Sequence, residues 1–166
     1  MARRTVRLLV LSLSLSLALS VGIFAREARA CGPNISTETA AASGTPEAEV
    51  QQVVERYLLA LHTRRVARAV AFWAPDARVV TPLTGHGCSP GSMHALSREV
   101  WVQRRIDDVA RRRYEPQTIG LPVARPDGTI EVTVTAQSHE APLVETLALR
   151  PIDGQWRIVS LVSNRP

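Results

Sequence analysis

Residues 129–137 read TIEVTVTAQ, and apolar and polar side chains alternate strictly along them. A period of two is typical of a β-strand with one buried face, here formed by Ile130, Val132, Val134 and Ala136. The turn sequence Pro126-Asp127-Gly128 precedes this strand. Similar patterns predict three more strands, at 118–124, 143–150 and 156–163, the last two joined by Asp153-Gly154. The C-terminal half is therefore expected to form four antiparallel strands.

Upstream of these strands the apolar residues recur at helical spacing. The segment 46–61, PEAEVQQVVERYLLAL, has its apolar residues on one helix face, with Thr45 placed to cap it and Pro46 at the first helical position. A second helix is expected at 65–73, with Trp73 on its apolar side and Pro75 ending it. A third is expected at 92–113, with a buried side made by Leu96, Val100, Trp101, Ile106 and Val109.

Between the second and third helices the sequence predicts a strand at 77–83 and a glycine-rich loop at 84–92. The order of elements is then helix, helix, strand, helix and four strands. Such an order indicates an α+β domain, in which a curved antiparallel sheet packs against three N-terminal helices.

The N-terminus has the features of an export signal. Three arginines lie within residues 1–7, an uncharged apolar run follows at 8–25, and Ala28-Arg29-Ala30 resembles a cleavage site. We predict a signal peptide at 1–30, a flexible leader at 31–45 and one domain at 46–166. Two alternatives stay open: an uncleaved membrane anchor, and a lipid attached to Cys31 after cleavage. Export implies a periplasmic or extracellular location.

Charge and cysteine content narrow the classes of partner. The formal net charge is +5, but residues 1–30 hold five Arg and one Glu, which leaves about +1 for the rest of the chain. This balance disfavours nucleic-acid binding, which requires a basic surface. Cys31 and Cys88 are able to form a disulfide after export. His86, Cys88 and His94 do not have the spacing of a structural zinc site, so no metal is expected. No cofactor is expected either.

Three phrases resemble the nuclear transport factor 2-like superfamily: VVERYLLAL at 53–61, FWAPDARVVTP at 72–82 and DGQWRIVSL at 153–161. This superfamily includes ketosteroid isomerase and SnoaL-like cyclases. The resemblance implies a cone whose pocket lies between the concave sheet face and the helices, and it implies a homodimer. In ketosteroid isomerase a tyrosine and two aspartates carry the chemistry. Tyr57 matches the tyrosine, but Thr81 and Leu147 stand at the aspartate positions, so that reaction is not expected.

Several residues remain as pocket candidates. Tyr57 is either a core tyrosine or a donor in the pocket, and Trp101 is either core or pocket wall. Glu145 shares a strand face with Leu143 and Leu147, and it is either solvated or a base near Tyr57. Arg104 and Arg105, together with 111–113, give the third helix a basic character. A solvated surface explains it, and an anionic partner or a membrane face is the alternative.

The sequence therefore predicts an exported, non-catalytic domain that binds a small apolar ligand or a protein partner in or around the cone. A cofactor-free SnoaL-like lyase, isomerase or hydrolase acting on a small hydrophobic substrate is the alternative. An envelope scaffold subunit is the third hypothesis.

Overall fold

The computed structural model describes residues 35–37, 44–82, 93–111, 117–137 and 141–165, all within the second of the chain's two compact units, Pro33–Pro166. The helices are α1 (Pro46–His62), α2 (Val66–Val70) and α3 (Arg98–Ala110). The strands are β1 (Ile35–Thr37), β2 (Trp73–Pro82), β3 (Met93–Leu96), β4 (Gln117–Ile119), β5 (Val123–Ala124), β6 (Ile130–Ala136), β7 (Leu143–Ile152) and β8 (Gln155–Ser163).

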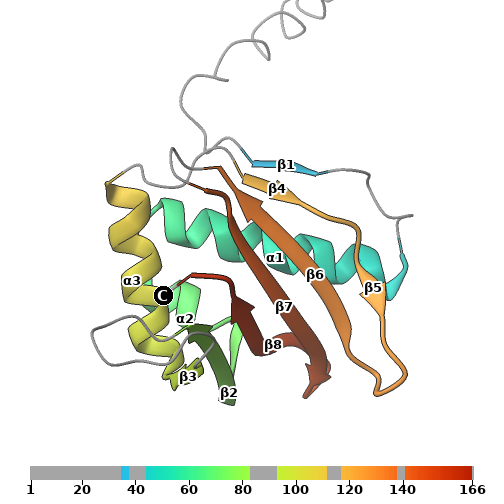
Figure 1. The fold of residues 1–166 in the computed structure, drawn as a ribbon. Coiled ribbons are helices and arrows are strands. Elements are labelled where there is room, and N and C mark those ends of the chain that lie inside the picture. The colour runs from blue at the N-terminus through green and yellow to red at the C-terminus, as the bar shows by residue number, and fades with distance from the viewer. Residues whose placement is uncertain (1–34, 38–43, 83–92, 112–116, 138–140, 166) are drawn as a thin grey trace, which may run out of the picture. The chain divides into compact units, whose positions relative to one another are not determined.

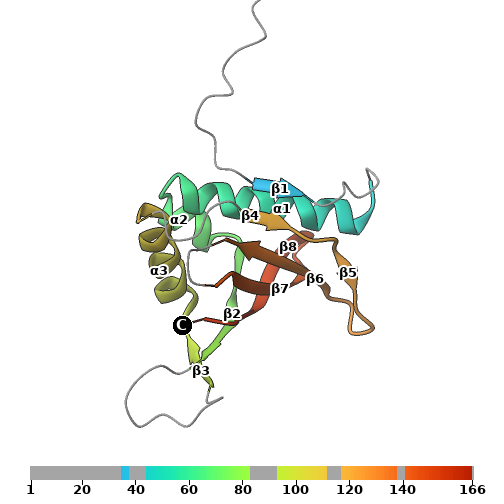
Figure 2. The same cartoon turned by 45° about the horizontal axis from the view of Figure 1, so that its top comes forward.

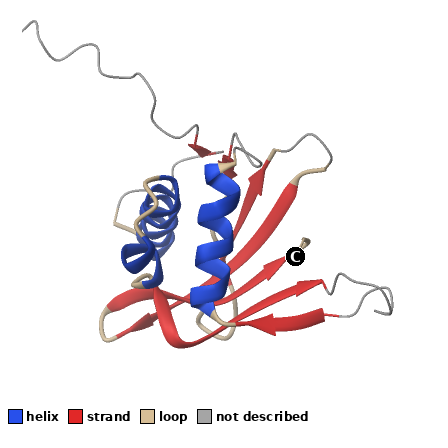
Figure 3. Cartoon of the chain, turned by 90° about the vertical axis from the view of Figure 1, so that its left-hand side faces the viewer, coloured by secondary structure: helices blue, strands red, loops and turns tan. Residues whose placement is uncertain are grey.

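The strands form one sheet in the order β1-β4-β6-β7-β8-β2-β3, and β5 pairs separately with β6 (Figures 1 and 2). Neighbouring strands are antiparallel except for the pairs β1–β4 and β2–β8, which are parallel. Figure 3 shows the sheet curving around one side of the helices. The predicted α+β class, with three helices packed against a curved sheet, is confirmed.

The first helix and the last hairpin form where local chemistry predicts them. Thr45 caps α1, because its hydroxyl accepts a hydrogen bond from the Ala48 N–H at 3.2 Å. Asp153 and Gly154 both have positive φ, 51° and 71°, as a two-residue turn with the twist of its strands requires. This turn joins β7 and β8, whose residues pair from Ile152–Gln155 onward.

The second helix is shorter than predicted. It ends at Val70, and Trp73, expected on its apolar side, instead begins β2 and pairs with Ile158 of β8. Pro75 therefore lies inside a strand instead of ending a helix. The strand tolerates it because the pairing with β8 is interrupted between Trp73 and Arg78, so that no ladder hydrogen bond is lost.

The third helix begins later than predicted, at Arg98, with Ser97 as its cap. The preceding segment 93–96 is strand β3, so Leu96 lies on a strand and not on the helix. Val100, expected in the buried side of the helix, is 50% exposed, whereas Trp101, Ile106 and Val109 are buried as predicted.

Two short strands also differ from the sequence prediction. The segment expected as one strand at 118–124 forms β4 and β5, separated by residues 120–122. Residues 35–37, inside the segment expected to be a flexible leader, form β1 and pair in parallel with β4. A three-residue edge strand is too short to produce a readable alternation, so its position depends on the partner strand.

The core lies between the helices and the sheet face that they cover. Alternate residues of β6 point into it, and Ile130, Val132, Val134 and Ala136 are all buried, as the alternation predicted. From α1 the core receives Val54, Leu58 and Leu61, each fully buried. One transverse row of this sheet face, however, is polar, and it positions the candidate site.

Candidate functional site

The polar row crosses the sheet at Glu145 of β7. Glu145 is paired with Val134 of β6 on one side and with Ser163 of β8 on the other. Thr81 of β2 follows directly after the pair Val80–Val162, so it lies next to Ser163, and its other neighbour is His94 of β3. Glu145, Ser163 and Thr81 are each at most 1% exposed. The row thus places polar groups where a core normally holds apolar ones.

Glu145 is paired with an arginine from α3. The Arg105 Nε lies 2.7 Å from the Glu145 Oε1, and both side chains are 1% exposed. The contact is a close ion pair, although the N–H does not point along the line of a normal hydrogen bond. Burial raises the pKa of the Glu145 carboxyl above its ordinary value, while the Arg105 guanidinium acts in the opposite direction.

Tyr57 brings a phenol into the same interior. Its ring makes edge contacts with Phe72 and Trp73, with centroids 6.4 Å and 5.8 Å apart. Burial raises the pKa of the Tyr57 hydroxyl, and the charge of Glu145 raises it further. Arg105 and the indole N–H groups of Trp73 and Trp101 act in the opposite direction. The phenol, the carboxylate and the guanidinium are therefore close enough to act on one another.

Several buried polar atoms around this ion pair have unused hydrogen-bonding capacity. The Tyr57 hydroxyl, the Thr81 hydroxyl and the indole N–H groups of Trp73 and Trp101 make no hydrogen bond of normal geometry with any described residue. Buried polar atoms in proteins are almost always satisfied. We call these four residues, together with the ion pair, the interior cluster: Tyr57, Trp73, Thr81, Trp101, Arg105 and Glu145.

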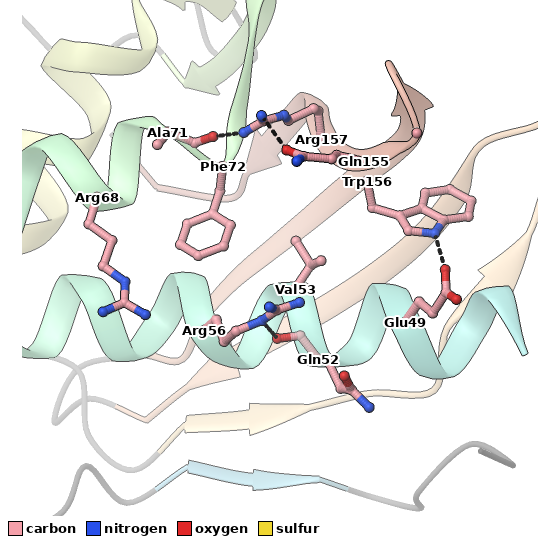
Figure 4. A pocket seen from close by; sticks show the side chains of 11 residues that line it. Glu49, Gln52, Val53, Arg56, Arg68, Ala71, Phe72, Gln155, Trp156 and Arg157 are labelled. Atoms are coloured by element: carbon pink, nitrogen blue, oxygen red, sulfur yellow. Dashed lines mark hydrogen bonds between the residues drawn. The ribbon is translucent and has the colours of Figure 1, made fainter. Parts of the chain in front are cut away.

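A second feature is a hollow of about 430 Å³ between α1, α2 and the β7–β8 hairpin (Figure 4). Arg56 of α1, Arg68 of α2 and Arg157 of β8 line it, together with Phe72 and Trp156. The Trp156 indole N–H donates to the Glu49 carboxylate at 2.9 Å. We call this hollow the arginine groove.

The sequence matches one family model over residues 45–162, the family described as "Putative lumazine-binding". The chain belongs to this family. Among solved structures it is similar to an NTF2-like protein of unknown function from Silicibacter pomeroyi DSS-3, at 18% identity and a TM-score of 0.54, over 70% of this chain and 92% of that one. An NTF2-like protein of unknown function from Methylobacillus flagellatus KT gives 14% identity, a TM-score of 0.50, and coverage of 76% and 96%. No match was found among curated proteins.

This family membership and these two structures confirm the predicted nuclear transport factor 2-like fold. All five residues predicted to line the pocket lie on the helix-covered side of the sheet and are buried: Tyr57, Thr81, Trp101, Glu145 and Leu147. Leu147 contributes to the apolar core. The Glu145 side chain is buried, so the solvated alternative is wrong.

One member of the interior cluster, Arg105, was not predicted from the sequence. Arg105 was expected on a solvated surface, but it is 1% exposed, and this prediction was wrong. A signal was available, because Arg105 lies four residues after Trp101 and so falls on the buried stripe of α3. Trp73 was expected on the apolar side of a helix, in the core or the pocket wall; it is buried, but it lies at the start of β2.

Some predictions concern residues outside the described part of the chain. These are the signal peptide at 1–30, Cys31, His86, Cys88 and the arginines 112–113. In the ranges that the structure does describe, no helix is both long and apolar enough to cross a membrane. Nor do three His, Cys, Asp or Glu side chains of those ranges gather where they would hold a metal ion.

Proposed function

We propose that this chain is an exported, non-catalytic domain that binds a small, flat, aromatic molecule at the interior cluster. The observation that carries the proposal is the ion pair of Arg105 and Glu145, buried beside the Tyr57 hydroxyl. A buried ion pair is no more stabilising than apolar side chains of similar volume, so folding alone does not explain it. Binding explains it, because a ligand needs a few convergent polar groups in an apolar wall.

The chemistry of the cluster suits a heterocycle that carries both carbonyl and N–H groups. Arg105 and the two indoles are donors for carbonyl oxygens, whereas Glu145 accepts from a ring N–H. The rings of Tyr57, Trp73 and Trp101, each at most 3% exposed, would contact a flat molecule that enters between them. Lumazine, the compound in the family's description, is such a heterocycle, and it is the probe of choice.

The test is titration of the purified full chain with lumazine, followed by fluorescence and by native mass spectrometry. We expect saturable binding, which Tyr57→Phe weakens about tenfold through the loss of one hydrogen bond. The double variant Arg105→Met/Glu145→Leu should bind at least a hundredfold more weakly. Arg104→Gln, at the adjacent and only partly buried position of α3, is the matched control and should bind normally. Equal binding by all variants would move the ligand elsewhere.

A cofactor-free lyase or isomerase is the second candidate. Burial raises the pKa of the Glu145 carboxyl, and the charge of Glu145 acts on the Tyr57 hydroxyl. A carboxylate in such a setting is a candidate general base. Glu145→Gln separates the two functions: a binding protein shows no turnover, either with the native side chain or in the variant. An enzyme would convert its substrate with the native side chain and lose that conversion in the variant.

Export and assembly require separate measurements. The intact mass of protein purified from its own host should lack residues 1–30 if the signal is cleaved. An added acyl mass would reveal a lipid on Cys31, and the full mass would favour an uncleaved anchor and the scaffold hypothesis. Sedimentation of the mature chain tests the homodimer, which stays a prediction from the resemblance. Binding of a protein partner would be favoured if native mass spectrometry finds no small molecule.

A further inference from the structure

We propose that the arginine groove is a second binding site, for a small molecule that carries an oxyanion on a flat aromatic body. The groove is lined by residues of α1, α2 and β8 and does not include the interior cluster. The inference therefore goes beyond the proposed function. Its oxyanion is either a phosphate or a carboxylate, because both match the planar donor fork of a guanidinium.

The described lining of the groove holds three arginines and one carboxylate, so its charge is positive on balance. Arg56, Arg68 and Arg157 line one hollow, and none of them forms an ion pair with a described carboxylate. The one acidic residue in the lining, Glu49, accepts a hydrogen bond from Trp156. Three like charges around one hollow repel each other, and an anion bound among them relieves that repulsion.

Two of the three arginines are already oriented by the fold. Arg157 donates to the carbonyl of Ala71 and to the Gln155 side chain, the latter at 2.6 Å. The Nε of Arg56 donates to the Gln52 carbonyl at 3.1 Å, which leaves its two Nη groups for another acceptor. Arg68 makes no hydrogen bond with a described residue. Because less side-chain freedom is lost on binding, such preorganisation favours affinity.

The walls of the groove explain why the ligand should be aromatic. Phe72 and Trp156 are half-buried, and Val53 closes the hollow from α1. Figure 4 shows the Phe72 ring pointing toward α1, with Arg68 and Arg56 on either side of it in this view. A volume of about 430 Å³ lies in the range of small-molecule pockets, roughly 300–1,000 Å³. The groove is thus sized for a molecule of one or two rings.

The test uses 1-naphthyl phosphate, with 1-naphthoate, 1-naphthol and inorganic phosphate as comparison ligands, in calorimetric titrations of the full chain. We expect 1-naphthyl phosphate or 1-naphthoate to bind, and the tighter of the two identifies the oxyanion. Binding should weaken as salt is raised, because the groove is open to solvent. Arg56→Gln and Arg68→Gln should each weaken it about tenfold.

Arg78→Gln is the matched control, since Arg78 is an exposed arginine of β2 outside the groove. It should leave binding unchanged. The proposal is overturned if neither anion binds at millimolar concentration, if 1-naphthol binds as tightly, or if the Arg56→Gln/Arg68→Gln variant binds normally. The Arg105→Met/Glu145→Leu variant should lose lumazine and keep 1-naphthyl phosphate. This difference separates a failure of the groove from a failure of the interior cluster.

Discussion

Replacing Arg105 by Met should destabilise the domain strongly and in a pH-dependent way. The substitution keeps the length of the side chain but leaves the Glu145 carboxylate, which is 1% exposed, without the guanidinium 2.7 Å away. Removal of one partner from a buried ion pair costs about 3–5 kcal/mol. We therefore expect a loss of about 3–5 kcal/mol in the free energy of unfolding at neutral pH.

The pH dependence follows from the direction of the pKa shift. The pKa of Glu145 is already raised by burial, and the loss of Arg105 removes the influence that lowers it. A carboxyl whose folded pKa is above its unfolded value contributes stability that is present below the unfolded pKa, about 4.3, and lost as pH rises through the folded pKa. Arg105→Met should therefore be least destabilised in mild acid and most destabilised above neutrality.

The double variant Arg105→Met/Glu145→Leu tests the same reasoning from the other side. It removes both charges and leaves apolar side chains of similar volume, so its stability should lie within about 1 kcal/mol of the native chain, or above it. The coupling energy between the two sites follows from the double-mutant cycle. A large coupling is expected because the groups are in direct contact.

Urea unfolding followed by the fluorescence of the three tryptophans measures these quantities, at pH 5 and at pH 7.5. Arg104→Met, at a partly exposed neighbouring position, is the control and should change stability by no more than about 0.5 kcal/mol. The reasoning is refuted if Arg105→Met loses less than about 1 kcal/mol at pH 7.5 and shows no recovery at pH 5. Such a result would mean that water reaches the pair.

Three further predictions concern single positions. Burial raises the pKa of the Tyr57 hydroxyl. The neutral phenol therefore contributes its full stability below the pKa of an unfolded tyrosine, about 10, and this stability falls as the pH rises above that value. At about pH 11 the native chain should have lost about 1.4 kcal/mol more than Tyr57→Phe, as measured by urea unfolding. Val102→Ala should lower the free energy of unfolding by about 2 kcal/mol because Val102 is fully buried, whereas Val100→Ala should change it by no more than about 0.5 kcal/mol. Equal effects would mean that α3 does not bury Val102 and expose Val100. Gly154→Ala should lower stability by about 1 kcal/mol because φ is 71°, and Gly154→Asn should lower it less.

The sequence predicted the elements whose causes are local. Helix α1 carries its own cap and apolar stripe, and the β7–β8 hairpin carries its own turn at Asp153-Gly154. The start of β2 was missed because Trp73 becomes a strand residue only through its pairing with Ile158, which is far along the chain. The same holds for β3, which exists through its pairing with β2.

The candidate site was predicted in its residues but not in its connections. Alternation along β7 placed Glu145 with Leu143 and Leu147, but the opposite face holds Val144 and Ala148 and is nearly as apolar. Hydrophobicity therefore did not decide which face the helices cover. That choice depends on how α3 packs, and the packing of α3 also determines that Arg105 reaches Glu145.

The energetics of the pair link the fold to the proposed binding role. The row that contains Glu145 lies directly beside the row of Val132, Leu147 and Leu161, all fully buried. Apolar residues at both 105 and 145 would extend that core at no loss of stability, so the carboxylate and its arginine are not needed for folding. If the double variant is as stable as the native chain and has lost lumazine binding, the interior cluster serves the ligand and not the fold. If it is as stable and still binds, the pair serves neither, and the arginine groove becomes the first site to study.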